Sequence, residues 1–191
     1  MSQLTVYADA RAEQPEVITG YDAIAERLGA IGVAFERWPG TDSVAESAGS
    51  DEVMEAFAGP VERLKAQYDF QSADVISVGP DHPDKDAMRQ KFLSEHIHSD
   101  FEVRFFVAGR GLFFLHPDDS VYAVLCEAGD LISVPANMRH WFDMGGEPSL
   151  KVIRLFTTPE GWVAQFTGNK IADRFPRMEQ YLEQFPARSV A

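Results

Sequence analysis

The sequence predicts a mostly β fold with added helices, in which an antiparallel β-barrel carries the helices on its outside. Two observations support this prediction. From residue 95 to residue 160, short runs rich in β-branched and aromatic residues alternate with turn residues at the even spacing of an antiparallel sandwich or barrel. Before residue 95, strand-like runs alternate with segments whose apolar residues follow helical spacing.

The first half of the chain is expected to supply the outer helices. A helix is predicted from Tyr21 to Leu28, and a helical segment over 41–68 is expected to break at Gly59-Pro60. Pro83 begins a further helix that carries Phe92 toward the centre of the chain. Strands are expected at 4–7, 33–38 and 74–78.

The second half is expected to form the barrel. We predict strands at 101–108, 112–115, 120–126, 130–134, 140–143 and 150–156, with a final helix near 177–185. Gly109-Arg110-Gly111 is interpreted as a hairpin turn between two of them. We expect one domain over 1–191, with a mixed part at 1–94, a barrel core at 95–160 and a C-terminal turn and helix at 161–191.

Composition limits the function. The net charge of −13 disfavours nucleic-acid binding, which needs a basic surface. We find no apolar run near the ~20 residues that span a bilayer. The N-terminus lacks the pattern of a secretory signal, and Cys126 is the single cysteine, so a reducing cytoplasm is expected.

The segment 96–104, His-Ile-His-Ser-Asp-Phe-Glu-Val-Arg, is the strongest chemical signal. If it is an unbroken strand, its even-numbered residues share one face. That face would carry His96, His98, Glu102 and Arg104. Two imidazoles and a carboxylate suit a divalent transition metal, and His140 is the candidate for a fourth ligand.

Other residues near this segment have two interpretations. Arg104, on the ligand face, either pairs with a carboxylate such as Glu102 or binds an anionic substrate. Arg154 is a weaker candidate of the same kind, and an exposed edge position is favoured for it. Aromatic residues are candidates for a substrate pocket, although core packing is favoured for each: Phe92, Phe142 and Trp162. His82 and His116 are expected to be solvated.

The spacings also match a known pattern. His96-x-His98, Glu102 and Gly109 follow the first motif of the cupin barrels, and Gly129, Pro135 and His140 follow the second. Gln90, Asn137 and Met144 depart from the usual residues of these motifs. Together with Gly-x-Gly-x-Phe at 109–113 and Gly-Asp-Leu-Ile-Ser-Val-Pro at 129–135, the pattern resembles the acireductone dioxygenase family of metal-dependent cupins.

This resemblance implies a cupin-type jelly roll and a complete mechanism. The four ligands would hold one Fe(II) or Ni(II) per chain, and Arg104 would stabilise the charge of the substrate. Acireductone (1,2-dihydroxy-3-keto-5-methylthiopentene) would be cleaved with O2 in methionine salvage by a monomer. The Fe(II) form would give 2-keto-4-methylthiobutyrate and formate. The Ni(II) form would give 3-methylthiopropionate, formate and CO.

Two other functions fit the same motifs. One is a different cupin metalloenzyme, such as a dioxygenase acting on a flavonoid-like enediol or an isomerase. The other is a cupin that binds a small ligand without catalysis, although the full ligand set argues against it. Cupins host many functions, so the fold alone does not decide among them.

Overall fold

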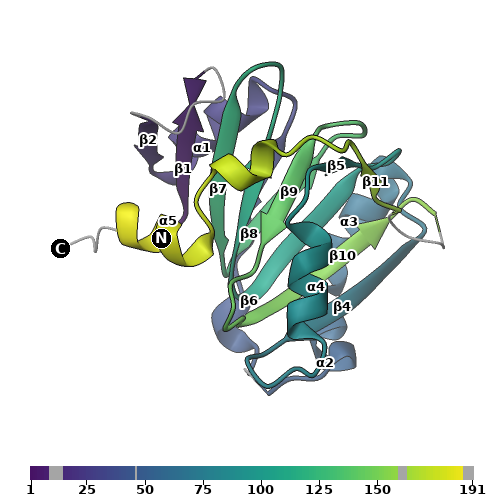
Figure 1. Cartoon of the computed structure of the whole chain (residues 1–191). Helices are drawn as coiled ribbons and strands as arrows, with labels where there is room; N and C mark the ends of the chain where they lie inside the picture. The colour runs from purple at the N-terminus through teal and green to yellow at the C-terminus, as the bar shows by residue number, and fades with distance from the viewer. Residues whose placement is uncertain (9–14, 46, 159–162, 187–191) are drawn as a thin grey trace.

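Two antiparallel sheets that share one long strand form the body of the protein (Figure 1). A computed structural model describes residues 1–8, 15–45, 47–158 and 163–186. The strands are β1 (Gln3–Tyr7), β2 (Glu16–Thr19), β3 (Ala34–Arg37), β4 (Ser72–Val78), β5 (His96–Ile97), β6 (Glu102–Leu115), β7 (Val121–Glu127), β8 (Asp130–Val134), β9 (His140–Asp143), β10 (Leu150–Phe156) and β11 (Gln165–Phe166).

The shared strand is β6. Its first half pairs with β8 and β10, and its second half pairs with β7 and β9. The strand bends at Gly109, whose φ of 75° lies in the left-handed region that glycine adopts without strain. A Cβ at this position would lie 1.7 Å from the carbonyl oxygen of Ser149. The expected hairpin at Gly109-Arg110-Gly111 is therefore wrong, since the glycine bends one continuous strand into both sheets.

Some helices cover the outer faces of the sheets, and others pack their apolar residues against the core between the sheets. They are α1 (Tyr21–Gly29), α2 (Ser50–Ala56), α3 (Ala58–Tyr68), α4 (Lys85–Phe92) and α5 (Met178–Gln184), with 3-10 helices η2 (Thr41–Ser43) and η3 (Ile171–Arg174). Apolar residues of α2 and α3 pack on the outer face of β6, β8 and β10. Those of η3 and α5 pack on the outer face of β1, β7 and β9. In Figure 1, α5 accordingly lies on the β1 side and α2 on the β4 side.

The space between the two sheets is filled by a third apolar cluster. Side chains such as Phe106, Phe113, Val124 and Val152 are fully buried in it. They alternate along their strands with the outward-facing residues of the other two clusters, as a two-sheet core requires. The architecture is thus the expected antiparallel jelly roll with external helices.

Most of the expected elements are present, with shifted boundaries. The helical segment at 41–68 is broken at Phe57, before the expected Gly59-Pro60, and Pro60 lies in the first turn of α3. Proline is tolerated there because the first-turn N–H groups have no partner inside the helix. Strand β2 was not expected from the sequence. Among the described residues, no helix is both long and apolar enough to cross a membrane.

Candidate metal centre

Two strands and the loop between them supply three of the four expected ligands. His96 opens β5, His98 lies in the loop that follows, and Glu102 opens β6. The segment 96–104 is therefore not one unbroken strand, and this part of the expectation is wrong. Inside β6 the alternation holds, because Glu102 and Arg104 lie two residues apart and are paired to each other.

The loop after β5 is held by an unusual residue. Asn137 has a φ of 62°, in the left-handed region, at the position where the cupin motif usually has glycine. Asparagine tolerates this conformation better than most residues. Its backbone N–H donates to the carbonyl oxygen of His98 at 2.8 Å. The departure from the motif therefore leaves the loop geometry intact and ties it to a candidate ligand.

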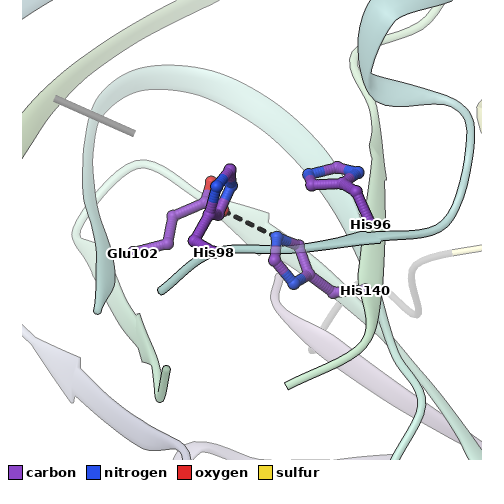
Figure 2. Close-up of side chains that lie close together, drawn as sticks. All are labelled: His96, His98, Glu102 and His140. Carbon is purple, nitrogen blue, oxygen red and sulfur yellow. Dashed lines mark hydrogen bonds and ion pairs between the residues drawn. The ribbon is translucent and has the colours of Figure 1, made fainter. Parts of the chain in front are cut away.

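The fourth ligand arrives from the neighbouring strand. His140 opens β9 and is the cross-strand partner of His96 in β5. Figure 2 shows the three imidazoles and the Glu102 carboxylate gathered in one place. Their ligand atoms all lie within 4.8 Å of one another, and all four residues are buried. One ion reaches such a set after small side-chain movements.

Backbone carbonyl groups hold all three imidazoles in one tautomer. A carbonyl oxygen only accepts, so each Nδ1 carries a hydrogen, and in the neutral ring Nε2 keeps its lone pair. Metal-binding histidines are commonly fixed in this way by an outer acceptor. The N···O distances are 2.8 Å from His96 to Ser94, 3.0 Å from His98 to Val163 and 2.7 Å from His140 to Met138.

The Nε2 atoms of two of these rings lie close to a carboxylate. Oε2 of Glu102 lies 2.8 Å from Nε2 of His140 and 3.2 Å from Nε2 of His98. Lone pairs on nitrogen and oxygen repel at such distances unless a cation, either a proton or a metal ion, lies between them. A borderline divalent transition metal suits imidazole and carboxylate donors together, so the four residues fit such an ion.

The pKa values of the candidate ligands shift in different directions. Burial and the neighbouring His140 lower the pKa of His96 to about 4. Burial opposes ionisation of Glu102, but the charge of Arg104 and hydrogen bonds from the histidines outweigh it and hold the pKa of Glu102 well below its ordinary value. Burial also disfavours the charged form of His98, but the hydrogen bond with Glu102 outweighs it and raises the pKa of His98.

Arg104 lies directly behind the carboxylate. Its Nε is 2.7 Å from Oε1 of Glu102, and the residue is only 5% exposed. Its guanidinium also lies over aromatic rings, with distances to the ring centroids of 4.5 Å for Phe142, 5.3 Å for Phe113 and 5.4 Å for Phe92. Such cation–π contacts are stronger when the cation is desolvated. The structure thus places Arg104 in a carboxylate pair, which is one of its two interpretations.

The structure describes three of the four remaining residues that were expected near the pocket. Phe92 and Phe142 meet edge to face, with ring centroids 6.5 Å apart. Arg154 is the cross-strand partner of Arg104, and its guanidinium forms two hydrogen bonds with Asp74, at 2.8 and 2.5 Å. Trp162 lies outside the described residues.

One histidine was misjudged from the sequence. His116 was expected to be solvated, but it is 5% exposed and its Nδ1 lies 2.5 Å from Oε1 of Glu95. The turn residues that follow His116 suggested exposure, and the burial comes from packing against distant segments. His82, by contrast, is partly exposed in its loop, where its Nδ1 accepts from the N–H of Asp84 at 3.2 Å.

Comparisons with known proteins relate the chain to acireductone dioxygenases. An acireductone dioxygenase of Methylococcus capsulatus is 63% identical over 185 residues, covering 97% of this chain and 100% of the relative. One of Stutzerimonas stutzeri is 56% identical, covering 94% and 99%.

A solved structure and a family model point the same way. The structure of acireductone dioxygenase from Bacillus anthracis, with a cadmium ion in its active centre, matches with a TM-score of 0.78 and 31% identity, covering 87% of this chain and 98% of that one. The model of the ARD/ARD′ family matches residues 3–164. The chain therefore belongs to the ARD/ARD′ family, whose relatives named here are acireductone dioxygenases.

Proposed function

We propose that this chain is a metal-dependent dioxygenase that cleaves acireductone with O2 in methionine salvage. The observation that carries the proposal is the buried set of His96, His98, Glu102 and His140, whose ligand atoms lie within 4.8 Å of one another. The high identity to acireductone dioxygenases over nearly the full chain supports the substrate assignment. One Fe(II) or Ni(II) ion per chain is the proposed cofactor.

The ligands are proposed to act as a set. Three neutral imidazoles and one carboxylate leave a divalent ion with net positive charge, which attracts an anionic substrate inside an acidic protein. When bound, the ion supplies a Lewis acid and a template for two oxygens of the enediol. The carbonyl groups that accept from each Nδ1 hold the three rings oriented for this task.

Arg104 is proposed to be the catalytic cation of the chain. Its Nε is paired with Oε1 of Glu102, and a guanidinium is a planar, permanently charged group whose geometry suits the oxygens of an anion. A buried guanidinium beside the ligand set favours the deprotonated enediol over the neutral one. In this role Arg104 stabilises negative charge on the substrate while it fixes the Glu102 carboxylate.

Aromatic side chains are proposed to enclose the substrate. Phe92 and Phe142 lie beside Arg104, and their rings suit the thioether tail of acireductone. Trp162 and Arg154 are retained as further substrate-binding candidates. A largely apolar pocket with few polar anchors is the usual form of a small-molecule site.

Two products are proposed for one protein. The Fe(II) form gives 2-keto-4-methylthiobutyrate and formate, and the Ni(II) form gives 3-methylthiopropionate, formate and CO. Since Ni(II) binds such ligands more tightly than Fe(II), metal supply rather than the ligand set decides occupancy.

The enzyme is proposed to work as a monomer in the cytoplasm. Its one cysteine, Cys126, is buried as a free cysteine, which suits a reducing compartment. The large apolar side chains exposed among the described residues are few, which suits a chain that has no permanent partner: Met1, Val17, Tyr68, Phe101, Val163 and Phe166.

Oxygen uptake tests this function. Metal-free protein is reloaded separately with Fe(II) and with Ni(II), supplied with acireductone, and its products are identified. Turnover with both ions and different products is expected. A protein that binds one ion per chain but consumes no oxygen with either would refute the substrate assignment and leave the metal site in place.

A further inference from the structure

A buried acid–histidine pair lies beside the metal centre, outside the four ligands. Glu95 is 1% exposed and His116 is 5% exposed. Nδ1 of His116 lies 2.5 Å from Oε1 of Glu95, within hydrogen-bond distance, and hydrogen bonds between an imidazole and a carboxylate are among the stronger ones in proteins. Since Glu95 directly precedes His96, this pair holds the backbone at the first residue of β5.

The second oxygen of Glu95 is also occupied. The hydroxyl of Thr167 donates to Oε2 at 2.5 Å, and the N–H of Thr167 donates to the carbonyl oxygen of Glu95 at 3.1 Å. Thr167 directly follows β11, whose Phe166 pairs with His96. Glu95 thus joins β11 to the end of β6, because His116 follows Leu115.

The same pair reaches the strand of another ligand. The N–H of His116 donates to the carbonyl oxygen of Arg139 at 2.8 Å, one residue before His140. The preceding residue, Leu115, is the cross-strand partner of His140. One chain of contacts therefore runs from the residue before His96 to the residue before His140.

Strand pairing alone fixes His96 weakly relative to His140, although β9 itself pairs with β6 over four residues. β5 has two residues, and its register with β9 consists of the single pair His96–His140. Ring contacts follow from this pair, with imidazole centroids 4.4 Å apart. A two-residue strand has few ladder hydrogen bonds to resist sliding, so side-chain contacts must set its position.

We propose that Glu95 and His116 are positioning residues that set the separation of His96 and His140 for the metal ion. The proposal rests on the metal site described above. Neither residue belongs to the group of four candidate ligands. They act by holding the backbone next to His96 and next to His140. Thr167 belongs to the same group of hydrogen-bonded residues.

The first test replaces the acid. Co(II) alone is the probe, because its affinity is measured by competition with a chelator and its absorption spectrum reports coordination geometry. Glu95→Gln keeps the shape of the side chain and removes the charge. We expect Co(II) affinity to fall about tenfold or more, as is typical for outer partners of metal ligands, with a changed absorption spectrum.

The second test separates the hydrogen bond from the bulk of the histidine. His116→Leu removes the donor, whereas His116→Asn keeps an N–H near the position of Nδ1. The Leu variant is expected to lose Co(II) affinity, and the Asn variant is expected to recover most of it. If His116→Leu does not fold because Glu95 is left unpaired, leucine and asparagine at position 116 are compared in a chain that also carries Glu95→Gln.

A matched control removes a buried carboxylate elsewhere. Asp130 is 0% exposed, accepts from Arg37 at 2.6 Å and from the N–H of Glu127 at 2.9 Å, and has no metal ligand among these partners. Asp130→Asn is expected to lower the unfolding temperature and to leave Co(II) affinity and spectrum unchanged.

The outcomes are distinct. Wild-type Co(II) affinity and spectrum in Glu95→Gln and His116→Leu, with only a lower unfolding temperature as in Asp130→Asn, would overturn the proposal and leave the proposed function standing. A wild-type chain that fails to bind one Co(II) ion would overturn both.

Discussion

Nε of Arg104 lies 2.7 Å from Oε1 of Glu102, whereas Oε2 of the same carboxylate faces His140. The two oxygens therefore have separate partners. Breaking a buried ion pair by removing one member commonly costs about 3–5 kcal/mol, because the other charge is left uncompensated. Arg104 therefore contributes to the fold of the metal-free protein as well as to its proposed chemistry.

This relationship sharpens the prediction for Arg104. Arg104→Ala is expected to retain metal, since the ion itself then compensates Glu102, but to lose most of its turnover because the substrate charge has no partner. Metal content and steady-state kinetics on the loaded variant measure this. Arg104→Lys keeps the positive charge but lacks the planar guanidinium, and its turnover is expected to lie between those of the wild type and Arg104→Ala. Loss of metal in the Ala variant would instead make Arg104 a purely structural partner of Glu102.

The ligand assignment gives a second prediction. Alanine at His96, His98 or His140 is expected to remove most bound metal and all activity, because one of four donors is lost. Metal per chain is measured by elemental analysis. His82→Ala serves as the control, since His82 lies in a partly exposed loop and is expected to keep full metal. A His140→Ala variant with wild-type metal content would contradict the site.

The site was predictable because its information is local in sequence. His96, His98 and Glu102 lie within seven positions, and the spacing to His140 matched a motif. Strand alternation placed Arg104 beside Glu102 correctly. The argument assumed an unbroken strand over 96–104, and the ligands converge although the backbone there is a short strand, a loop and a new strand.

The errors arose where long-range packing decides the local structure. Glycine is common in turns, so a turn was expected at Gly109. In the fold Gly109 lies against the backbone of Ser149, and pairing with β10 keeps the strand continuous. His116 is followed by proline and two aspartates, which suggested exposure, yet Glu95 buries it from twenty-one positions away. Propensity describes a residue and its neighbours, whereas these outcomes depend on segments that only the fold brings together.

The low pKa of His96 predicts how the metal-free protein responds to acid. The pKa falls from 6.5 in the unfolded chain to about 4 in the fold, so below pH 6.5 the unfolded state binds a proton that the folded state does not. Stability is therefore fully present above 6.5 and is lost as the pH falls toward 4. Each unit of this shift is worth about 1.4 kcal/mol, giving a loss on the order of 3 kcal/mol.

Other groups titrate in other ranges. The raised pKa of His98 stabilises the fold below 6.5, and this contribution is lost only as the pH rises through its folded value. The lowered pKa of Glu102 matters only below its ordinary value of 4.5. Urea unfolding of metal-free protein between pH 6.5 and 4.5 therefore reports mainly on His96. His96→Gln is expected to flatten this dependence, and an unchanged slope would contradict the assignment.

A glycine on β6 gives the last prediction. A Cβ at Gly111 would lie 2.4 Å from Cζ of Phe142, whose ring centroid lies 4.5 Å from Cζ of Arg104. Because Phe142 is 2% exposed and packed among other rings, it has little room to move. Gly111→Ala is expected to cost about 1–3 kcal/mol by overpacking and to lower turnover by displacing Phe142 from Arg104.

The matching control is Gly29→Ala in α1, where a Cβ meets nothing within 4 Å. This change is expected to leave stability unchanged or to raise it by about 0.5–1 kcal/mol, since alanine has the higher helix propensity. Urea unfolding of both variants and kinetics of the metal-loaded forms make the comparison. If Gly111→Ala unfolds at the wild-type urea concentration with wild-type kinetics, Phe142 is free to move and does not hold Arg104.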